Sequence, residues 1–316
     1  MTWNSYYRGD GVSRPVELPE PPPWRTFPRT SMSAVFQPPP GLTEAVNAAL
    51  CLRRPLLITG LPGSGKSTVI EQVTDELDFG PVLRWHVTSR STLSDALYRY
   101  DALGRIHAQQ LGRGAGSDPG NRPADDIAPF LQLGPLGTAL LPADRPRALL
   151  IDEIDKSDLD LPSDLLDVLE RGEFEVPELV RYEQDEVAVR LWNSEERQTV
   201  TRGRVACTQF PFIVMTSNGE QIFPAPFLRR CIRYTMAKPT VDTLRRLVAA
   251  HLGVDVPAEG SVAELVAGFA ARLETGESLA VDQLLNAVFL LSREDAPQGA
   301  AREELAALLL RELSRA

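Results

Sequence analysis

The stretch GLPGSGKST, residues 60–68, decides the fold of this chain of 316 residues. It follows the apolar run PLLITG at 55–60 and leads into a predicted helix, so its glycines lie where a strand turns into a helix. Backbone N–H groups in such a turn, together with the amino terminus of the helix, can surround phosphate oxygens. The stretch therefore predicts a phosphate-binding loop for ATP.

Two side chains of this loop have predicted tasks of their own. The ammonium of Lys66 would reach the outer phosphates, and the hydroxyl of Ser67 would bind Mg²⁺. Lysine is rare here, because only three of the 33 basic residues are lysines, and this favours a role for Lys66 that a planar guanidinium cannot fill. The predicted ATP-binding residues are Gly60, Leu61, Pro62, Gly63, Ser64, Gly65, Lys66, Ser67 and Thr68.

A second motif supplies carboxylates. The run ALLIDEID at 148–155 brings Asp152 to the carboxyl end of a predicted strand, where ligands bind in open α/β sheets. Asp152 would hold Mg²⁺ through water, and Glu153 would polarise the water that attacks the γ-phosphate. Together with the phosphate loop, this carboxylate pair predicts an ATPase.

The surrounding chain alternates short apolar runs with helices, which predicts an α/β core with a parallel sheet covered on both faces. After Pro239 only helices are expected, and they would form a small helical lid domain. The predicted strands are 55–60, 81–87, 147–155, 211–218 and 231–236. The predicted helices are 43–53, 66–77, 92–110, 162–171, 240–252, 261–274, 281–292 and 300–315, the last with Leu305, Leu308, Leu309 and Leu313 on one face.

Three segments lie outside this alternation. Residues 112–126 are polar and rich in glycine and proline, which predicts a loop, and the alternation within 174–208 predicts hairpin strands. Residues 1–41 hold nine of the 26 prolines together with several aromatic residues, which predicts an extended arm wrapped over the main domain or a neighbour. The predicted domains are the arm (1–41), a nucleotide-binding core with two insertions (42–237) and the lid (238–316).

Bulk properties limit the partners and the compartment. A net charge of −10 and a pI near 5.0 disfavour a general nucleic-acid binder, because phosphate neutralisation needs clustered basic residues. The three cysteines have no metal-like spacing, which favours a reducing compartment. No apolar run of about 18 residues and no signal-peptide pattern occur, so we expect a cytoplasmic protein without a membrane segment.

Four stretches taken in order carry a family resemblance. GLPGSGKST, LLIDEID, VMTSN (214–218) and FLRRC (227–231) resemble the AAA+ ATPases, with the first two as Walker A and Walker B motifs, and within them the MoxR-like group. Residues 88–109 and 149–174 are similar to bacterial members associated with von Willebrand factor A partner proteins. The resemblance covers about 42–237 and is loose in the lid. It implies a P-loop NTPase core of three layers and a chaperone that remodels or activates a partner protein.

The resemblance also implies two further catalytic roles. Asn218 would be the polar sensor that hydrogen-bonds both the γ-phosphate and the attacking water, although an Asn-Gly turn that ends a strand is an alternative. Arg230 would be the arginine finger that reaches the nucleotide of the next subunit, with Arg229 as the competing candidate. An arginine acting between subunits requires a closing interface, so we expect a homo-oligomeric ring of about six subunits.

One family feature is missing. A second sensor arginine is expected early in the third lid helix, but SLAVDQLL at 278–285 offers Asp282 near that position. This departure keeps open a slow nucleotide switch or scaffold in a bacterial signalling or defence system. A nucleic-acid motor or loader is the other alternative, and its support is a set of arginines in the two insertions, Arg113, Arg122, Arg202 and Arg204.

Overall fold

The computed structural model describes residues 6–7, 9–27, 36–114, 126–253, 256–257, 259–293 and 295–313, without the side chains of 111–114. It forms two compact units. The α/β unit comprises residues 38–59 and 67–235, and the helical unit comprises 1–37, 60–66 and 236–316. The division predicted from the sequence, into 1–41, 42–237 and 238–316, stays a prediction. None of the helices in the described ranges is long and apolar enough to cross a membrane.

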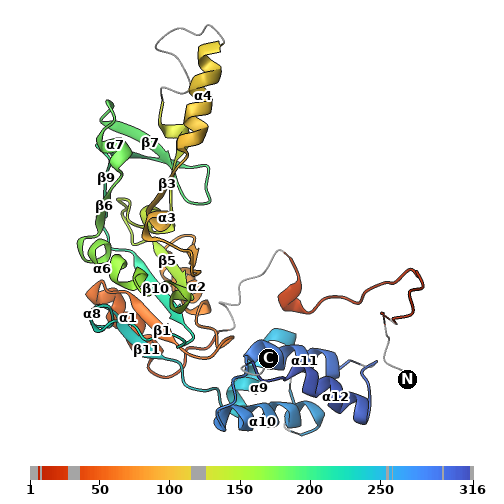
Figure 1. The fold of residues 1–316 in the computed structure, drawn as a ribbon. Helices are drawn as coiled ribbons and strands as arrows, with labels where there is room; N and C mark the ends of the chain where they lie inside the picture. Colours follow the sequence, from red (N-terminus) through yellow and green to blue (C-terminus); the bar gives the residue numbers. More distant parts are fainter. Residues whose placement is uncertain are drawn as a thin grey trace. The chain divides into compact units, whose positions relative to one another are not determined.

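A five-stranded parallel sheet forms the centre of the α/β unit (Figure 1), as the alternating pattern predicts. Its order is β11-β1-β10-β5-β2, and every neighbouring pair is parallel. All five strands predicted from the sequence are present. They are β1 (Leu56–Thr59), β2 (Leu83–His86), β5 (Ala148–Asp152), β10 (Phe212–Ser217) and β11 (Ile232–Thr235).

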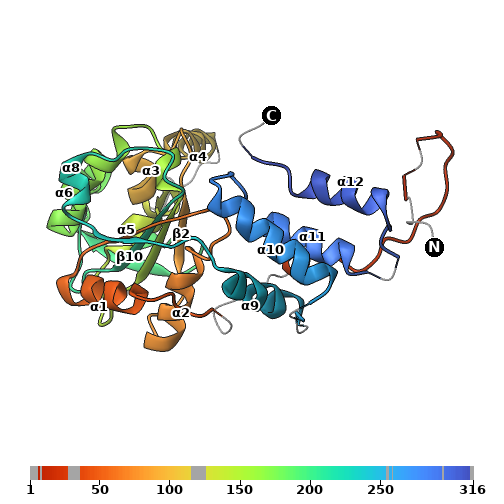
Figure 2. The same ribbon diagram turned by 90° about the horizontal axis from the view of Figure 1, so that it is seen from below.

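Helices cover both faces of this sheet, and Figure 2 shows α1 and α2 on one side with α3, α5 and α6 on the other. Because successive strand residues point to opposite faces, Leu57 and Met215 pack into the cluster that also holds Leu165 and Phe227. The central strands β1, β5 and β10 are almost continuously apolar for this reason, whereas the edge strands β2 and β11 carry exposed polar residues. The helices are α1 (Leu42–Leu52), α2 (Thr68–Leu77), α3 (Leu93–Leu97), α5 (Pro135–Ala139), α6 (Leu161–Arg171) and α8 (Ala225–Leu228).

A second, six-stranded sheet belongs to the same unit, in the order β3-β4-β7-β8-β9-β6. The hairpin predicted within 174–208 is confirmed, because β7 and β8 pair antiparallel from Glu186↔Thr201 to Arg190↔Arg197. The loop predicted at 112–126 lies almost entirely outside the described residues. The elements are β3 (Tyr98–Tyr100), β4 (Leu131–Leu133), β6 (Glu173–Glu175), α7 (Pro177–Val180), β7 (Glu186–Arg190), β8 (Arg197–Thr201) and β9 (Arg204–Ala206).

The single helix predicted over 92–110 is wrong. Thr92 caps the short α3, the chain then becomes extended as β3, and α4 (Ala102–Gly114) follows. The reason is tertiary, because Tyr98 and Tyr100 pair with Leu133 and Leu131 of β4. Aromatic side chains suit such a pleated, half-buried surface, and this pairing overrides the local helical pattern.

Four helices make up most of the helical unit: α9 (Val241–Leu252), α10 (Ser261–Glu274), α11 (Val281–Leu291) and α12 (Ala300–Leu309). The helix predicted to reach residue 315 ends at Leu309, and its predicted apolar stripe is only half right. Leu305 and Leu309 pack against the core of this unit, whereas Leu308 and Leu313 are exposed. The chain leaves the helix because the backbone N–H of Leu313 donates to the carbonyl of Ser278.

Part of the amino-terminal arm contacts the helical unit of its own chain. Trp24, in the short 3-10 helix η1 (Pro23–Arg25), donates from Nε1 to Oδ1 of Asn286 at 3.2 Å. Its ring also meets the rings of His251 and Phe289 edge-on, at centroid distances of 6.2 and 5.8 Å. Around Trp24 the arm therefore packs on α9 and α11, whereas near its end the carbonyl of Pro40 accepts from the hydroxyl of Tyr234 in β11 of the main domain at 3.0 Å. Packing of the rest of the arm on the main domain or a neighbour stays a prediction.

Candidate nucleotide site

The phosphate loop owes its shape to glycines in the left-handed backbone region. Gly63 and Gly65 have φ values of 73° and 85°, which strain any residue with a Cβ. A Cβ at Gly63 would also lie 3.2 Å from the backbone N of Val281 in α11. Within this loop the buried Lys66 donates from Nζ to the carbonyl oxygens of Gly60 and Leu61, both at 2.8 Å. The Lys66 ammonium is thus held by two backbone carbonyls of its own loop.

The loop and the start of α11 are neighbours within the helical unit. The carbonyl of Pro62 accepts from the backbone N–H of Val281 at 3.3 Å, and Leu61 packs against the core of this unit. Asp282 is the charged residue in the first turn of α11. Its backbone N would lie 3.3 Å from a Cβ at Gly63. Asp282, near the position where the second sensor arginine is expected, thus lies in the first turn of a helix beside the phosphate loop.

The two residues predicted to hold Mg²⁺ are in direct contact. Ser67, at the N-cap of α2, donates from Oγ to Oδ1 of Asp152 at 2.9 Å. The same Oδ1 accepts from Oγ1 of the buried Thr216 at 2.6 Å. Asp152 is the last residue of β5 and Thr216 lies on the adjacent β10, so the parallel register creates this cluster.

The donor set at this point suits Mg²⁺. In proteins Mg²⁺ is usually held by one or two carboxylates and by phosphates of the substrate, not by a cage of protein ligands. Asp152 and Ser67 supply one carboxylate and one hydroxyl. The described ranges contain no group of three or more His, Cys, Asp or Glu residues that could hold a metal by themselves.

Glu153 has a backbone conformation that is unusual for its residue type. Its φ and ψ are 58° and 48°, in the left-handed region, at a cost on the order of 1–3 kcal/mol. The surrounding structure holds this conformation, because the backbone N–H of Glu153 donates to Oγ1 of Thr216 at 2.9 Å. The Glu153 side chain stays 38% exposed, and its Oε2 lies 3.8 Å from Nε2 of His86.

The contacts of Thr216 with Asp152 and Glu153, and of His86 with Glu153, do not follow from the sequence patterns. In the sequence, Thr216 is one residue of VMTSN, and His86 is one residue of a predicted strand. Both contacts depend on strand register, because His86 is the register partner of Asp152 on β2. Asn218 is placed by the same sheet: it directly follows β10, which lies between β1 and β5.

The two arginines that follow α8 differ in their surroundings. Arg230 donates from Nε to Oε1 of Glu170 on α6 at 2.6 Å and from Nη1 to the carbonyl of Pro226 at 3.1 Å. Arg229 is exposed, and its guanidinium has no hydrogen bond or ion pair with any residue that the structure describes. Within the same described ranges no ion pair joins either guanidinium to Asp152 or Glu153. The structure does not bring the arginines to the carboxylates of their own chain.

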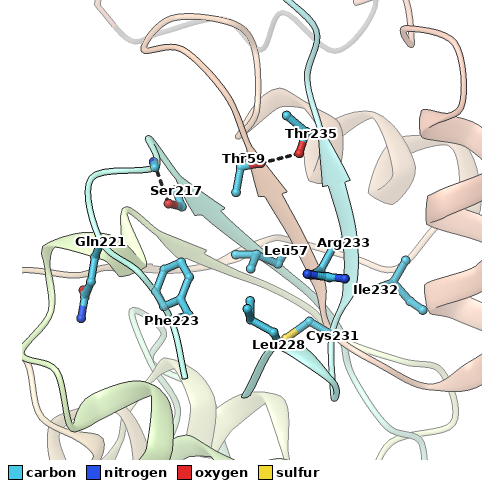
Figure 3. A pocket seen from close by; sticks show the side chains of 11 residues that line it. Leu57, Thr59, Ser217, Gln221, Phe223, Leu228, Cys231, Ile232, Arg233 and Thr235 are labelled. Atoms are coloured by element: carbon cyan, nitrogen blue, oxygen red, sulfur yellow. Dashed lines mark hydrogen bonds between the residues drawn. The ribbon is translucent and has the colours of Figure 1, made fainter. Parts of the chain in front are cut away.

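A cavity of about 580 Å³ lies on the sheet face beside α8 (Figure 3). Most of its lining residues come from β1, β10 and β11, from the loop after β10 and from Leu228 at the end of α8. Leu57 and Phe223 line it together with the Thr59–Thr235 pair, whose hydroxyls are 2.9 Å apart. None of the residues predicted to bind ATP or Mg²⁺ lines this cavity.

Comparison with known proteins agrees with this architecture. The model of the AAA domain, dynein-related subfamily, matches residues 55–221, which is more than half of the chain. The chain belongs to this AAA family. It is thus an AAA+ ATPase domain of the P-loop NTPase fold, and members of the family bind nucleotides. The match includes the phosphate loop, both carboxylates and Asn218.

Sequence comparison with curated proteins gives no match. Two solved structures are similar at low identity. A variant of RuvB from Thermotoga maritima is 13% identical with a TM-score of 0.39, over 84% of this chain and 66% of that one. NtrX from Brucella abortus, solved in complex with ADP, is 16% identical with a TM-score of 0.40, over 88% of this chain and 56% of that one. The chain thus spans less than two thirds of either protein.

Proposed function

We propose that this AAA protein hydrolyses Mg·ATP with Glu153 as the general base, and that it does so in a ring that remodels or activates a partner protein. The observation that carries the proposal is the cluster around Oδ1 of Asp152. Ser67 and Thr216 both donate to this oxygen, and Thr216 also fixes the backbone of Glu153. One hydroxyl thereby sets the position of the proposed metal ligand relative to the proposed base.

The proposed reaction needs little covalent chemistry from the protein. Lys66 binds the outer phosphates, and Glu153 accepts a proton from the water that attacks the γ-phosphorus, so that ATP and water give ADP and phosphate. Asn218 orients that water with its amide. Asp152 and Ser67 would hold Mg²⁺, which when bound neutralises charge on the phosphate oxygens.

A positive charge for the transition state would come from a second copy of the chain. The sequence favours Arg230 for this role, but the side chain of Arg230 is paired with Glu170. Arg229 is exposed, and its guanidinium is unpaired in the described part of the chain. These surroundings favour Arg229 as the arginine that reaches a neighbouring subunit. Because such a contact joins different surfaces of identical subunits, we propose a closed ring of about six copies.

A protein client fits the described surface better than a nucleic acid does. Two of the four arginines behind the nucleic-acid alternative are already paired, Arg202 with Asp185 and Arg204 with Glu173. Helix α4 instead exposes two apolar side chains, Leu103 and Ile106, which are 70% and 48% exposed. By the MoxR-like resemblance, we propose a von Willebrand factor A protein as the client.

A slow nucleotide switch is the second candidate, and Asp282 favours it. This residue puts a carboxylate in the first turn of α11, the helix beside the phosphate loop, where a sensor arginine was expected. Turnover measured with the client present separates the two candidates. A remodelling ATPase is stimulated by its client, whereas a switch stays slow.

Replacement of Glu153 tests the proposed chemistry. Glu153→Gln should bind ATP with the affinity of the wild type and lose turnover by about 100-fold or more, because an amide cannot accept the proton. The matched control is Glu183→Gln, which alters an exposed glutamate of the second sheet's connection. Turnover of Glu153→Gln that equals that of the control would reject Glu153 as the base.

A further inference from the structure

Asp155 is a buried carboxylate with no part in the chemistry proposed above. It lies in the 3-10 helix η4 (Ile154–Lys156), which begins directly after Glu153, and its exposed fraction is 7%. Its Oδ2 accepts from the backbone N–H of Asn218 at 2.8 Å and from that of Glu220 at 3.2 Å. Its Oδ1 is buried and has no hydrogen-bond partner in the described part of the chain.

These hydrogen bonds join the two loops that carry the proposed base and the proposed sensor. The loop after β5 holds Glu153 and Asp155, and the loop after β10 holds Asn218 and Glu220. Hydrogen bonds to a buried carboxylate are charge-assisted, about twice as strong as those between neutral groups. The exposed pair of Lys156 and Glu220 joins the same loops, but exposed ion pairs contribute little.

Side-chain acceptors hold the turn after β10. Its Gly219 has a φ of 81°, in the left-handed region that favours glycine. The backbone N–H of Gly219 donates to Oγ of Ser217, and the N–H groups of the two residues beside it, 218 and 220, donate to Asp155. Asp155 is therefore the principal attachment of this turn.

From this geometry we infer that Asp155 is a positioning residue for ATP hydrolysis, which sets the location of Asn218 relative to Glu153. The inference rests on the function proposed above. In this role Asp155 acts through the backbone N–H of Asn218, to which its Oδ2 is bonded. A displacement on the order of 1 Å of a positioned group can reduce turnover by about 100-fold, so the loss of this attachment should affect the reaction far more than it affects nucleotide binding.

Replacements of graded severity test the inference. Asp155→Ala removes both acceptors, whereas Asp155→Asn keeps one oxygen in a neutral side chain. We expect turnover to fall in the order wild type, Asp155→Asn, Asp155→Ala, with the last reduced by about 100-fold. The dissociation constant for ATP should change less than twofold in both variants. The control Lys156→Ala removes only the exposed pair and should leave turnover within about twofold of the wild type.

Folding is monitored by circular dichroism and thermal unfolding of each full-length variant. If Asp155→Ala does not fold, Asp155→Asn decides: a reduced turnover at unchanged ATP affinity supports the inference, and wild-type turnover overturns it. If both Asp155 variants fold and both turn over ATP as fast as Lys156→Ala does, the inference is overturned. A matching loss of ATP affinity also overturns it, because that result indicates general disruption of the site.

A double-mutant cycle distinguishes positioning from a merely structural role. If Asp155 acts through Asn218, the variant with both Asp155→Ala and Asn218→Ala loses no more turnover than Asn218→Ala does. Losses that multiply overturn the inference. The Glu153→Gln variant, measured in parallel, separates this inference from the proposed function. If Glu153→Gln keeps wild-type turnover, the proposed function is rejected. If Glu153→Gln and Asn218→Ala lose turnover but Asp155→Ala does not, only the role of Asp155 is rejected.

Discussion

At the scale of single residues, one threonine hydroxyl joins the two carboxylates of the proposed site. Thr216 donates to Oδ1 of Asp152 and accepts from the backbone N–H of Glu153. A hydroxyl has one donor and two acceptor lone pairs, so one side chain can serve both partners. Valine has nearly the same shape as threonine, but it can neither donate nor accept a hydrogen bond. The position is 1% exposed, so water cannot replace the lost hydrogen bonds.

We predict that Thr216→Val lowers the free energy of unfolding by about 1–3 kcal/mol, because it leaves a buried N–H and a carboxylate oxygen without this partner. Turnover should fall as well, since the backbone of Glu153 loses its support. Urea unfolding and steady-state turnover measure the two effects. Thr199→Val, at an exposed position of β8, is the matched control and should stay within about 0.5 kcal/mol of the wild type. Equal stabilities of the two variants would contradict the role of Thr216.

Cys231 gives a second prediction at this scale. Burial raises the pKa of its thiol from 9.0 to about 12, so the thiolate fraction below pH 9 is about a thousandfold lower than for an unperturbed thiol. Since the thiolate is the reactive form, iodoacetamide at pH 8 should modify the exposed Cys51 and leave Cys231 intact. Reactivity of Cys231 should appear only as the pH approaches 12 or the protein unfolds. Mass spectrometry after digestion measures it, and equal labelling of both cysteines at pH 8 would contradict the burial.

The residues found by sequence analysis and those missed differ in a physical way. Lys66, Asp152 and Glu153 lie in short stretches whose spacing alone relates them to phosphate chemistry. The contacts of Thr216 and Asp155 arise only when β10 pairs with β5, and nothing in the local sequence reports that pairing. The choice between Arg229 and Arg230 is of the same kind, because the pairing with Glu170 on α6 is a tertiary contact.

At the scale of elements, the parallel strands were the easiest to predict. The three central strands, β1, β5 and β10, are buried on both faces and therefore appear as short apolar runs between helices. The failures are elements whose identity depends on a distant partner. Strand β3 interrupts a helical pattern because β4 pairs with it, and α12 stops at Leu309 because the following chain bonds to Ser278.

The amino-terminal arm yields a prediction at this scale. Trp24 contributes two edge-on aromatic contacts and one hydrogen bond to the helical unit. Trp24→Ala should lower the free energy of unfolding by about 1–3 kcal/mol, since it removes apolar burial and leaves Oδ1 of Asn286 without this donor. Thermal unfolding of the full chain measures the change. The control is Phe27→Ala, at an arm position that is 70% exposed, and equal effects of the two variants would contradict the docking of the arm.

At the scale of the whole molecule, the proposed ATPase site is one that two copies of the chain complete. The described α/β unit holds the residues proposed as metal ligand, base and sensor, but neither candidate arginine has an ion pair with Asp152 or Glu153 of its own chain in the described ranges. The expectation of a second copy comes from the resemblance of FLRRC to the stretch that carries the arginine finger in AAA+ ATPases. Ring size and the client do not follow from the fold of one chain, because both are properties of surfaces that other molecules cover.

Mixing two inactive variants tests the shared site most directly. Glu153→Gln lacks the base and keeps both arginines, whereas a variant with Arg229→Ala and Arg230→Ala keeps the base and lacks the arginines. Each alone should bind ATP and hydrolyse it slowly, since an arginine finger contributes on the order of 10³–10⁵ in turnover. We predict that equimolar mixing restores a substantial fraction of wild-type turnover, because mixed rings contain interfaces with an intact base on one side and intact arginines on the other. Mixed rings that form, as native mass spectrometry can show, and yet hydrolyse no faster than their parents would contradict a site shared between subunits.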